Sequence, residues 1–179
     1  MYEYSYHSKP SNKLAIRVSG ALFAAAVITL ALVSVIKNVP FLGVAQFIST
    51  ILFTLAVLLL TRYVFKSFLV KIVETGDGRY DLTITECRGK NEKEKITVCR
   101  VSLSNIEEVA VKAKENANEL KKKTKGRKVY SYCPDLCPET ECYVFVTECG
   151  EPLLLKLSPD KTLLSILTTA SERSIDTEK

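Results

Sequence analysis

Residues 14–61 decide the architecture of this chain: LAIRVSGALFAAAVITLALVSVI, then KNVP, then FLGVAQFISTILFTLAVLLLT. The first apolar stretch has 23 residues with one charge, Arg17, and the second has 21 residues with none. A helix needs about 20 apolar residues to cross the hydrocarbon core of a bilayer. Since only four residues separate the stretches, we expect two spans, 14–36 and 41–61, that form an antiparallel hairpin.

Basic residues flank this hairpin unequally. Lys9, Lys13 and Arg17 lie at its start and Arg62, Lys66 and Lys71 at its end, against Lys37 alone in the connection. Because basic residues concentrate on the cytoplasmic side, the chain is predicted to be a multi-pass cell-membrane protein with both termini cytoplasmic. The alternative for the first stretch, a cleaved signal peptide, fits less well, because this stretch exceeds a usual signal core and a second span follows at once.

The net charge of +5 comes from residues 1–66, and the part after the hairpin is neutral. Residues 1–66 carry six Lys/Arg against Glu3, whereas residues 67–179 carry 19 basic and 19 acidic residues. A nucleic-acid binder concentrates basic charge in its binding domain, so we expect no nucleic-acid partner. The length leaves room for one small globular domain. The predicted organisation is a cytoplasmic tail at 1–13, the hairpin at 14–61, a cytoplasmic domain at 66–171 and a flexible tail at 172–179.

Residues after the hairpin show the period of β-strands. Residues 80–85 (YDLTIT) and 95–101 (KITVCRV) alternate apolar and polar side chains, and TGDG at 75–78 is a turn signal. Further strands are predicted near 67–74, 106–111, 128–133, 142–147 and 153–157. A carboxy-terminal helix follows, capped by Ser158, with Leu163, Ile166 and Leu167 on its apolar face. We expect an α+β domain, a strongly bent antiparallel sheet of about seven strands closed by this helix.

Two short segments have local features of their own. Tyr2, Tyr4 and Tyr6 alternate in the amino-terminal tail, which fits a strand or, as we favour, aromatic rings at the membrane interface. Within the hairpin, Gly20 and Ala24 form a small-xxx-small pair. Gln46, Ser49 and Thr50 share one face of the second span, and we expect this face to meet the first helix.

The order of elements, strands followed by one helix, resembles the pleckstrin-homology fold. Together with the tail, the tight hairpin, YDLTIT at 80–85 and VSLSNIEEV at 101–109, it is similar to bacterial membrane-anchored pleckstrin-homology-like proteins. The resemblance implies a binding or scaffolding domain held at the membrane, and it implies no catalytic residues.

The most basic stretch of the chain, residues 112–128, carries eight basic residues against Glu115 and Glu119. Near an anionic leaflet each Lys or Arg contributes about 1 kcal/mol to binding. The candidate lipid contacts are Lys112, Lys114, Lys121, Lys122, Lys123, Lys125, Arg127 and Lys128. Two alternatives are a mobile solvated loop, which we favour, and a stretch that folds back onto the acidic carboxy-terminal part.

All six cysteines follow the hairpin. In the cytoplasm thiols stay reduced, so we expect no disulfide framework. Cys133, Cys137, Cys142 and Cys149 are candidate ligands of a zinc or iron-sulfur centre, but their spacing lacks the usual Cys-x2-Cys pairs. The favoured interpretation for the strand cysteines is packing as small apolar residues, with no cofactor.

These patterns favour a membrane-anchored interaction or scaffolding module that is not an enzyme. The one histidine, His7, precedes the hairpin, so a cysteine nucleophile lacks an activating base in the domain. The expected partners are the membrane, an unknown protein segment, anionic lipid and, as an open alternative, further copies of the chain. Two other classes remain: a cysteine-based metal or redox sensor, and a small transporter or channel subunit. Neither span places a charged residue or histidine at its middle, which disfavours the last class.

Overall fold

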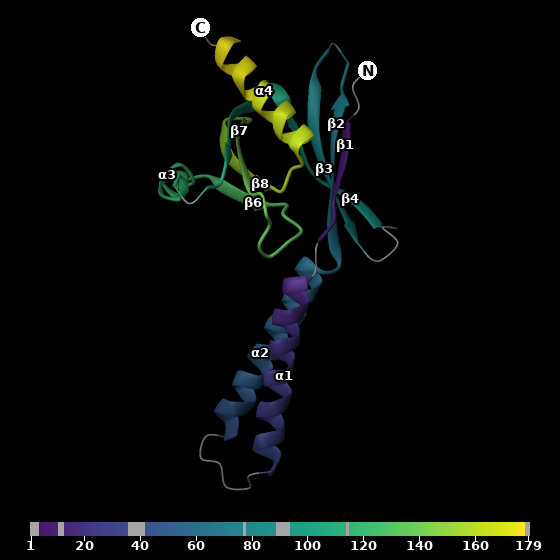
Figure 1. Ribbon diagram of the computed structural model, residues 1–179, viewed down its shortest axis with the longest axis vertical. Coiled ribbons are helices and arrows are strands. Elements are labelled where there is room, and N and C mark those ends of the chain that lie inside the picture. Colours follow the sequence, from purple (N-terminus) through teal and green to yellow (C-terminus); the bar gives the residue numbers. More distant parts are fainter. Residues whose placement is uncertain are drawn as a thin grey trace. The chain divides into compact units, whose positions relative to one another are not determined.

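A computed structural model of the chain describes residues 4–10, 13–35, 42–76, 78–88, 94–113 and 115–177, without the side chains of residues 35 and 174–177. The chain divides into two compact units (Figure 1). One is a helical hairpin within residues 10–66. The other is a sheet-rich domain that contains the described residues of the ranges 4–9, 67–134 and 138–177.

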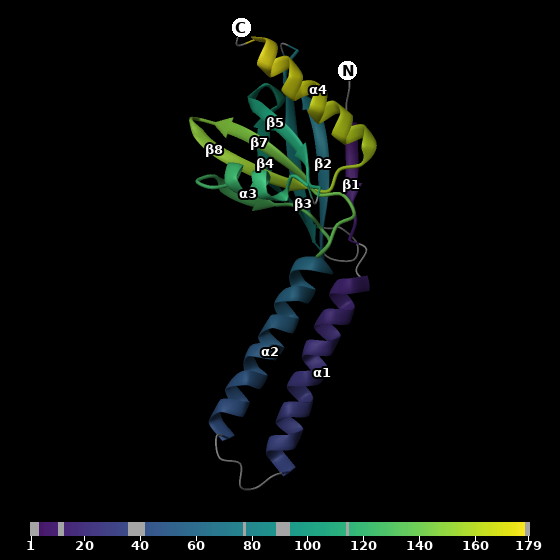
Figure 2. The ribbon, with the colours of Figure 1, turned by 60° about the vertical axis from the view of Figure 1, so that its left-hand side comes forward.

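The hairpin unit consists of helices α1 (Lys13–Val35) and α2 (Leu42–Tyr63), which run antiparallel (Figure 2). Both are long and apolar enough to cross a membrane. Most of their side chains are exposed, whereas a core helix of a soluble domain would be mostly buried. Two long apolar helices were predicted here, and the structure confirms them with ends shifted by one or two residues. The connecting residues 36–41 lie outside the described part.

Small side chains line the seam between the two helices. Ala15, Ser19 and Ala26 are buried on α1, and Ser49 and Ala56 on α2. Separations of four and seven residues keep one side of each helix facing the other, as in left-handed helix pairs. Small residues at these positions let the backbones approach closely. The Ser49 hydroxyl uses this closeness to donate a 2.9 Å hydrogen bond to the carbonyl of Ala26.

The seam is narrower than the face predicted from the sequence. Ser49 lies in it as expected, but Gln46 and Thr50 are exposed, and the Thr50 hydroxyl donates to the carbonyl of Gln46 in its own helix. Gly20 and Ala24 are exposed as well, so the small-xxx-small pair does not lie in the seam. The prediction was wrong for Gln46 and Thr50, because the buried positions of α2 are seven residues apart and include only Ser49 of the predicted face.

The first sheet of the domain has the strand order β1-β2-β3-β4. Its strands are β1 (Tyr4–Ser8), β2 (Lys66–Glu74), β3 (Tyr80–Arg88) and β4 (Glu94–Ser102). Strand β1 pairs antiparallel with β2, from Tyr4 opposite Ile72 to Ser8 opposite Phe68. The tail that we expected to rest at the membrane interface is therefore an edge strand of the sheet.

The second sheet has the strand order β5-β7-β8-β6. Its strands are β5 (Ile106–Val111), β6 (Lys128–Ser131), β7 (Cys142–Glu148) and β8 (Glu151–Leu157), and the 3-10 turn η1 (Leu103–Asn105) leads from β4 into it. Strand β6 pairs parallel with β8. The expected single antiparallel sheet of about seven strands is thus wrong. The described residues form two four-stranded sheets, because β1 extends the first and β6 crosses over to the far edge of the second.

The main core lies between the inner faces of the two sheets. Leu82 and Ile84 of β3 pack there with Val144 and Val146 of β7, and all four side chains are fully buried. Helix α4 (Lys161–Thr177) closes this core through a face that includes Leu163 and Leu167.

The predicted apolar face of α4 is confirmed. Leu163 and Leu167 are fully buried, and Ile166 is partly buried against the same core. The cap, however, is Asp160 and not Ser158, since the Asp160 carboxylate accepts a 2.8 Å hydrogen bond from the amide of Leu163. The helix also continues to Thr177, into the segment expected to be a flexible tail, while residues 178–179 lie outside the described part.

Candidate functional site

The basic segment 112–128 folds onto the outer face of the second sheet, the face turned away from the main core. It contains the short helix α3 (Ala117–Lys123) and leads through Gly126, with φ +87°, into β6. Leu120 is the buried residue of α3 and packs against Tyr143, Phe145 and Leu154. The expected mobile solvated loop is therefore an ordered third layer over this sheet.

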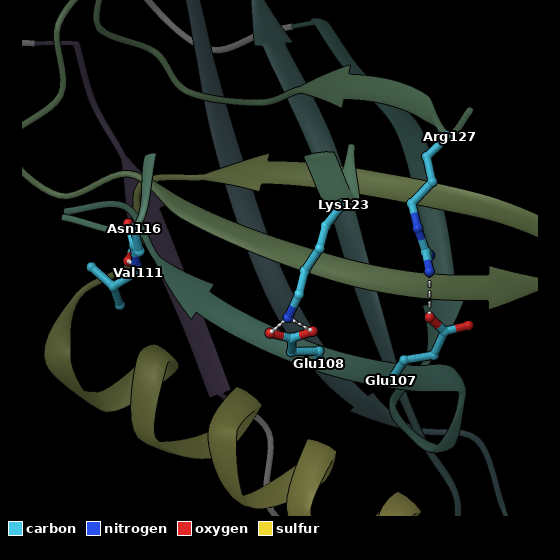
Figure 3. A network of polar contacts seen from close by, with 6 residues as sticks. All are labelled: Glu107, Glu108, Val111, Asn116, Lys123 and Arg127. Atoms are coloured by element: carbon cyan, nitrogen blue, oxygen red, sulfur yellow. Dashed lines mark hydrogen bonds and ion pairs between the residues drawn. The ribbon is translucent and has the colours of Figure 1, made fainter. Parts of the chain in front are cut away.

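Asn116 fixes the chain where it turns from β5 into α3. Its side-chain amide donates a 2.8 Å hydrogen bond to the carbonyl of Val111 (Figure 3). Its side-chain oxygen accepts one, also of 2.8 Å, from the amide of Ala113. An asparagine side chain suits a turn because it replaces backbone partners that neither the strand nor the helix provides. The start of α3 is thus held against the end of β5.

A β-bulge in β5 places two adjacent acids beside the basic segment. The register with β7 shifts between Ile106 and Glu108, so that Glu107 is the extra residue. In a regular strand neighbouring side chains point to opposite faces, whereas a bulge re-aims one of them. Both acids reach the segment: Glu107 receives a 2.8 Å contact from Arg127, and Glu108 accepts both contacts from Lys123, at 2.6 and 2.7 Å (Figure 3).

Arg127 is the most enclosed cation of this layer. Its guanidinium carbon lies 5.2 Å from the centroid of the Phe145 ring, within the range of a cation-π contact. Its Nη1 atom is buried without a hydrogen-bond partner among the described residues. Glu107, in turn, accepts hydrogen bonds from Thr147 and Arg127, and these hold the pKa of its carboxyl below the ordinary value despite partial burial.

Two further cations of the segment pair with acids that follow it in the chain. Lys112 contacts Glu141 at 2.5 Å, and Lys128 contacts Glu151 at 2.5 Å. Both glutamates belong to the acidic carboxy-terminal part, so these two cations, but not the whole basic stretch, make the contacts expected if the stretch folds back onto that part. Surface pairs of this kind add little to stability, but they do neutralise the charges that a ligand would meet.

Pairing divides the eight lipid-contact candidates into three groups. Lys112, Lys123, Arg127 and Lys128 face acids, as described above. Lys121, Lys122 and Lys125 are exposed and make no ion pair with any residue that the structure describes. Lys114 lies outside the described residues. The positive charge available to a partner is thus concentrated on α3 and the turn after it.

The four cysteines considered as metal ligands do not share one environment. Cys133 and Cys142 are buried, whereas Cys137 and Cys149 are exposed. Burial, followed by the nearby Cys133 thiol, raises the pKa of Cys142 to about 12. Reactive and metal-binding cysteines have lowered pKa values instead. Within the described ranges, no group of three or more His, Cys, Asp or Glu side chains could hold a metal ion.

Residue spacing alone did not reveal the acidic partners of the basic segment. The signal that could have found them is the pair Glu107-Glu108, which puts two acids in succession within a strand otherwise rich in apolar residues.

No family model, curated protein or solved structure matches this chain. The fold and the α3 layer therefore carry the functional argument.

Proposed function

We propose that this chain is a membrane-anchored binding module with a pleckstrin-homology-like cytoplasmic domain, and that its α3 layer binds anionic lipid headgroups. It carries out no catalysis of its own. The observation that carries the proposal is a set of three lysines, Lys121, Lys122 and Lys125, that pair with no acid among the described residues. They lie next to cations that are each matched by an acid. A set of exposed lysines of this kind suits binding to the negatively charged surface of a membrane that contains anionic lipids.

The order of elements supports the pleckstrin-homology-like character of the domain. Four strands form one sheet, the antiparallel strands β5, β7 and β8 belong to the other, and α4 follows them in the chain and packs against the core. Strand β6 and α3 are additions between β5 and β7. The proposed binding surface lies on these additions.

Two features support the anchoring of the domain at a membrane. The apolar helices provide the anchor, and only two residues separate the end of α2 at Tyr63 from the start of β2 at Lys66. The domain thus stays at a high effective concentration near any lipid headgroup, so a weak contact suffices for binding.

The test uses the full chain in nanodiscs of neutral phosphatidylcholine, so that the two apolar helices are already inserted in a bilayer. Flotation with vesicles then measures binding to a second membrane. We expect binding to vesicles that contain phosphatidylglycerol and none to phosphatidylcholine vesicles, with affinity falling as salt rises because exposed charges are screened within about 8 Å at physiological salt.

Replacing Lys121, Lys122 and Lys125 together by Gln should weaken this binding by up to ~3 kcal/mol, from about 1 kcal/mol for each lysine near an anionic surface. A matched control replaces Lys71, Lys95 and Lys161, three exposed lysines elsewhere in the domain, and should change it much less. Equal losses in the two variants would show that net charge alone drives binding. That result, or no binding by the unmodified chain, would overturn the lipid proposal.

A further inference from the structure

A hollow of about 280 Å³ lies between α3 and the outer face of the second sheet. Leu120 of α3 and Val129 of β6 contribute its apolar part. Its polar lining residues are Lys112, Lys121, Lys156, Thr124 and Tyr143. These residues come from five separate segments of the chain, so folding gathers three lysines around one concave site.

One carboxylate, that of Glu141, faces two of the three cations. Its Oε2 lies 2.5 Å from Nζ of Lys112, and its Oε1 lies 3.8 Å from Nζ of Lys156. The second distance exceeds a normal hydrogen bond, so Glu141 satisfies Lys112 well and Lys156 poorly. Lys121, the third cation, makes no ion pair within the described part of the chain. The hollow therefore has a surplus of positive charge.

The groups around the hollow are held in place. Nζ of Lys156 lies 4.9 Å from the centroid of the Tyr143 ring, a cation-π distance, and Tyr143 itself is buried. The hydrogen bond to Glu141 raises the pKa of Lys112, as expected for an ammonium group beside a carboxylate. The backbone amide of Lys112 also donates a 2.8 Å hydrogen bond to the carbonyl of Glu141, so the two residues are held side by side through their main chains as well.

We propose that this hollow binds the dianionic group of a phosphate monoester, with Lys121 and Lys156 as direct contacts and Glu141 as a competing internal anion. A dianion matches a site whose three lysines are accompanied by one carboxylate, that of Glu141, and lysine binds phosphate as a point charge without a demand for planar geometry. The inference deepens the proposed function, because Lys121 belongs both to the exposed α3 surface and to the hollow. The phosphate comes from a lipid headgroup or from a soluble metabolite.

Titration calorimetry on the full chain in phosphatidylcholine nanodiscs tests the site at low ionic strength. Glycerol phosphate serves as the soluble probe and dioctanoyl phosphatidic acid as the lipid probe. Binding of both identifies a site for the phosphate group itself, and binding of the lipid alone assigns the headgroup source. Either result supports the proposal, whereas binding of neither overturns it.

Variants that remove either an acidic or a basic side chain of the hollow make the test sharper, because they should change the phosphate affinity in opposite directions. Glu141→Gln removes the competing anion and should tighten phosphate binding by at least about tenfold, which corresponds to about 1.4 kcal/mol. Glu151→Gln is the matched control, since it removes an equal charge beside Lys128, which does not line the hollow, and should leave the affinity unchanged. Lys121→Gln, at an exposed position, should weaken binding by a similar factor.

Equal effects of Glu141→Gln and Glu151→Gln would overturn the site, because they would reflect overall charge. The failure of this inference is distinguishable from that of the proposed function. Phosphatidylglycerol vesicles present a phosphodiester monoanion and engage Lys122 and Lys125, so their flotation should persist when Lys156→Gln abolishes monoester binding.

Discussion

Leu120 connects the basic segment to the folded domain. It is the buried residue of α3, and it packs against Tyr143, Phe145 and Leu154 on the outer face of the second sheet. The helix has seven residues, too few to be stable alone in water, so it depends on this contact. The lysines around Leu120 are positioned only while its side chain is held.

Replacing Leu120 by Ala should lower the free energy of unfolding by roughly 2 kcal/mol, near the low end for buried leucines, because a thin outer layer can partly collapse onto the cavity. Hydrogen exchange reports the effect locally. The amides of residues 120 and 124, which donate to the carbonyls of Asn116 and Leu120, should exchange faster. Lys122→Ala on the same helix is the control and should leave exchange unchanged. Unaltered protection in Leu120→Ala would show that α3 does not depend on this packing.

Strand β1 is the element whose role differs most from the expectation. Tyr4 begins it and donates a 2.5 Å hydrogen bond to Asp160, the residue that caps α4. Burial, together with this hydrogen bond, raises the pKa of Tyr4 above its ordinary value, so the phenol remains a donor even at alkaline pH. One contact thus links the amino-terminal strand to the carboxy-terminal helix within the domain.

Tyr4→Phe should lower the free energy of unfolding by about 1 to 2 kcal/mol, since a hydrogen bond to a charged group is lost. Tyr6→Phe is the matched control, because Tyr6 also packs against the core from β1 but makes no such bond to Asp160. Thermal unfolding of the two variants, followed by near-ultraviolet circular dichroism, compares them directly. Equal midpoints would contradict a stabilising link between β1 and α4.

Elements with a strong local pattern of apolar residues could be predicted from the sequence. The hairpin followed from composition, and the buried face of α4 from the spacing of Leu163 and Leu167. Strand β1 could not be chosen over an interface tail, because its partner β2 lies some 60 residues further along the chain. Likewise, the parallel pairing of β6 with β8 and the bulge at Glu107 depend on contacts between distant strands, which local alternation does not encode.

At the candidate site, the sequence identified the basic residues but not their environment. Lys121, Lys122 and Lys125 are available to a partner because no acid in the described part of the chain pairs with them, whereas Lys123 faces Glu108 through the bulge in β5. The hollow also depends on Lys156 and Tyr143, which lie outside the basic stretch. Charge counting along the chain cannot separate paired from unpaired cations, because pairing is set by sheet register.

At the scale of the whole molecule, the pairing of β1 with β2 bears on membrane topology. Ser8 pairs with Phe68, so the chain leaves the sheet and returns to it at one strand pair, with the hairpin as the intervening segment. A tail on the opposite side of the membrane could not form this pair. The pairing therefore supports the proposal that the two strands lie on one side of the membrane, and the excess of flanking basic residues is the reason for proposing the cytoplasmic side.

Cysteine labelling in intact cells tests this membrane-anchored arrangement most directly. An impermeant maleimide is applied before or after permeabilisation, and peptide mapping reads each thiol separately. Cys149, exposed in the turn between β7 and β8, should be modified only after permeabilisation, whereas buried Cys142 should react only after denaturation. The account predicts this order. Modification of Cys149 in intact cells would place the domain outside the cytoplasm and contradict it.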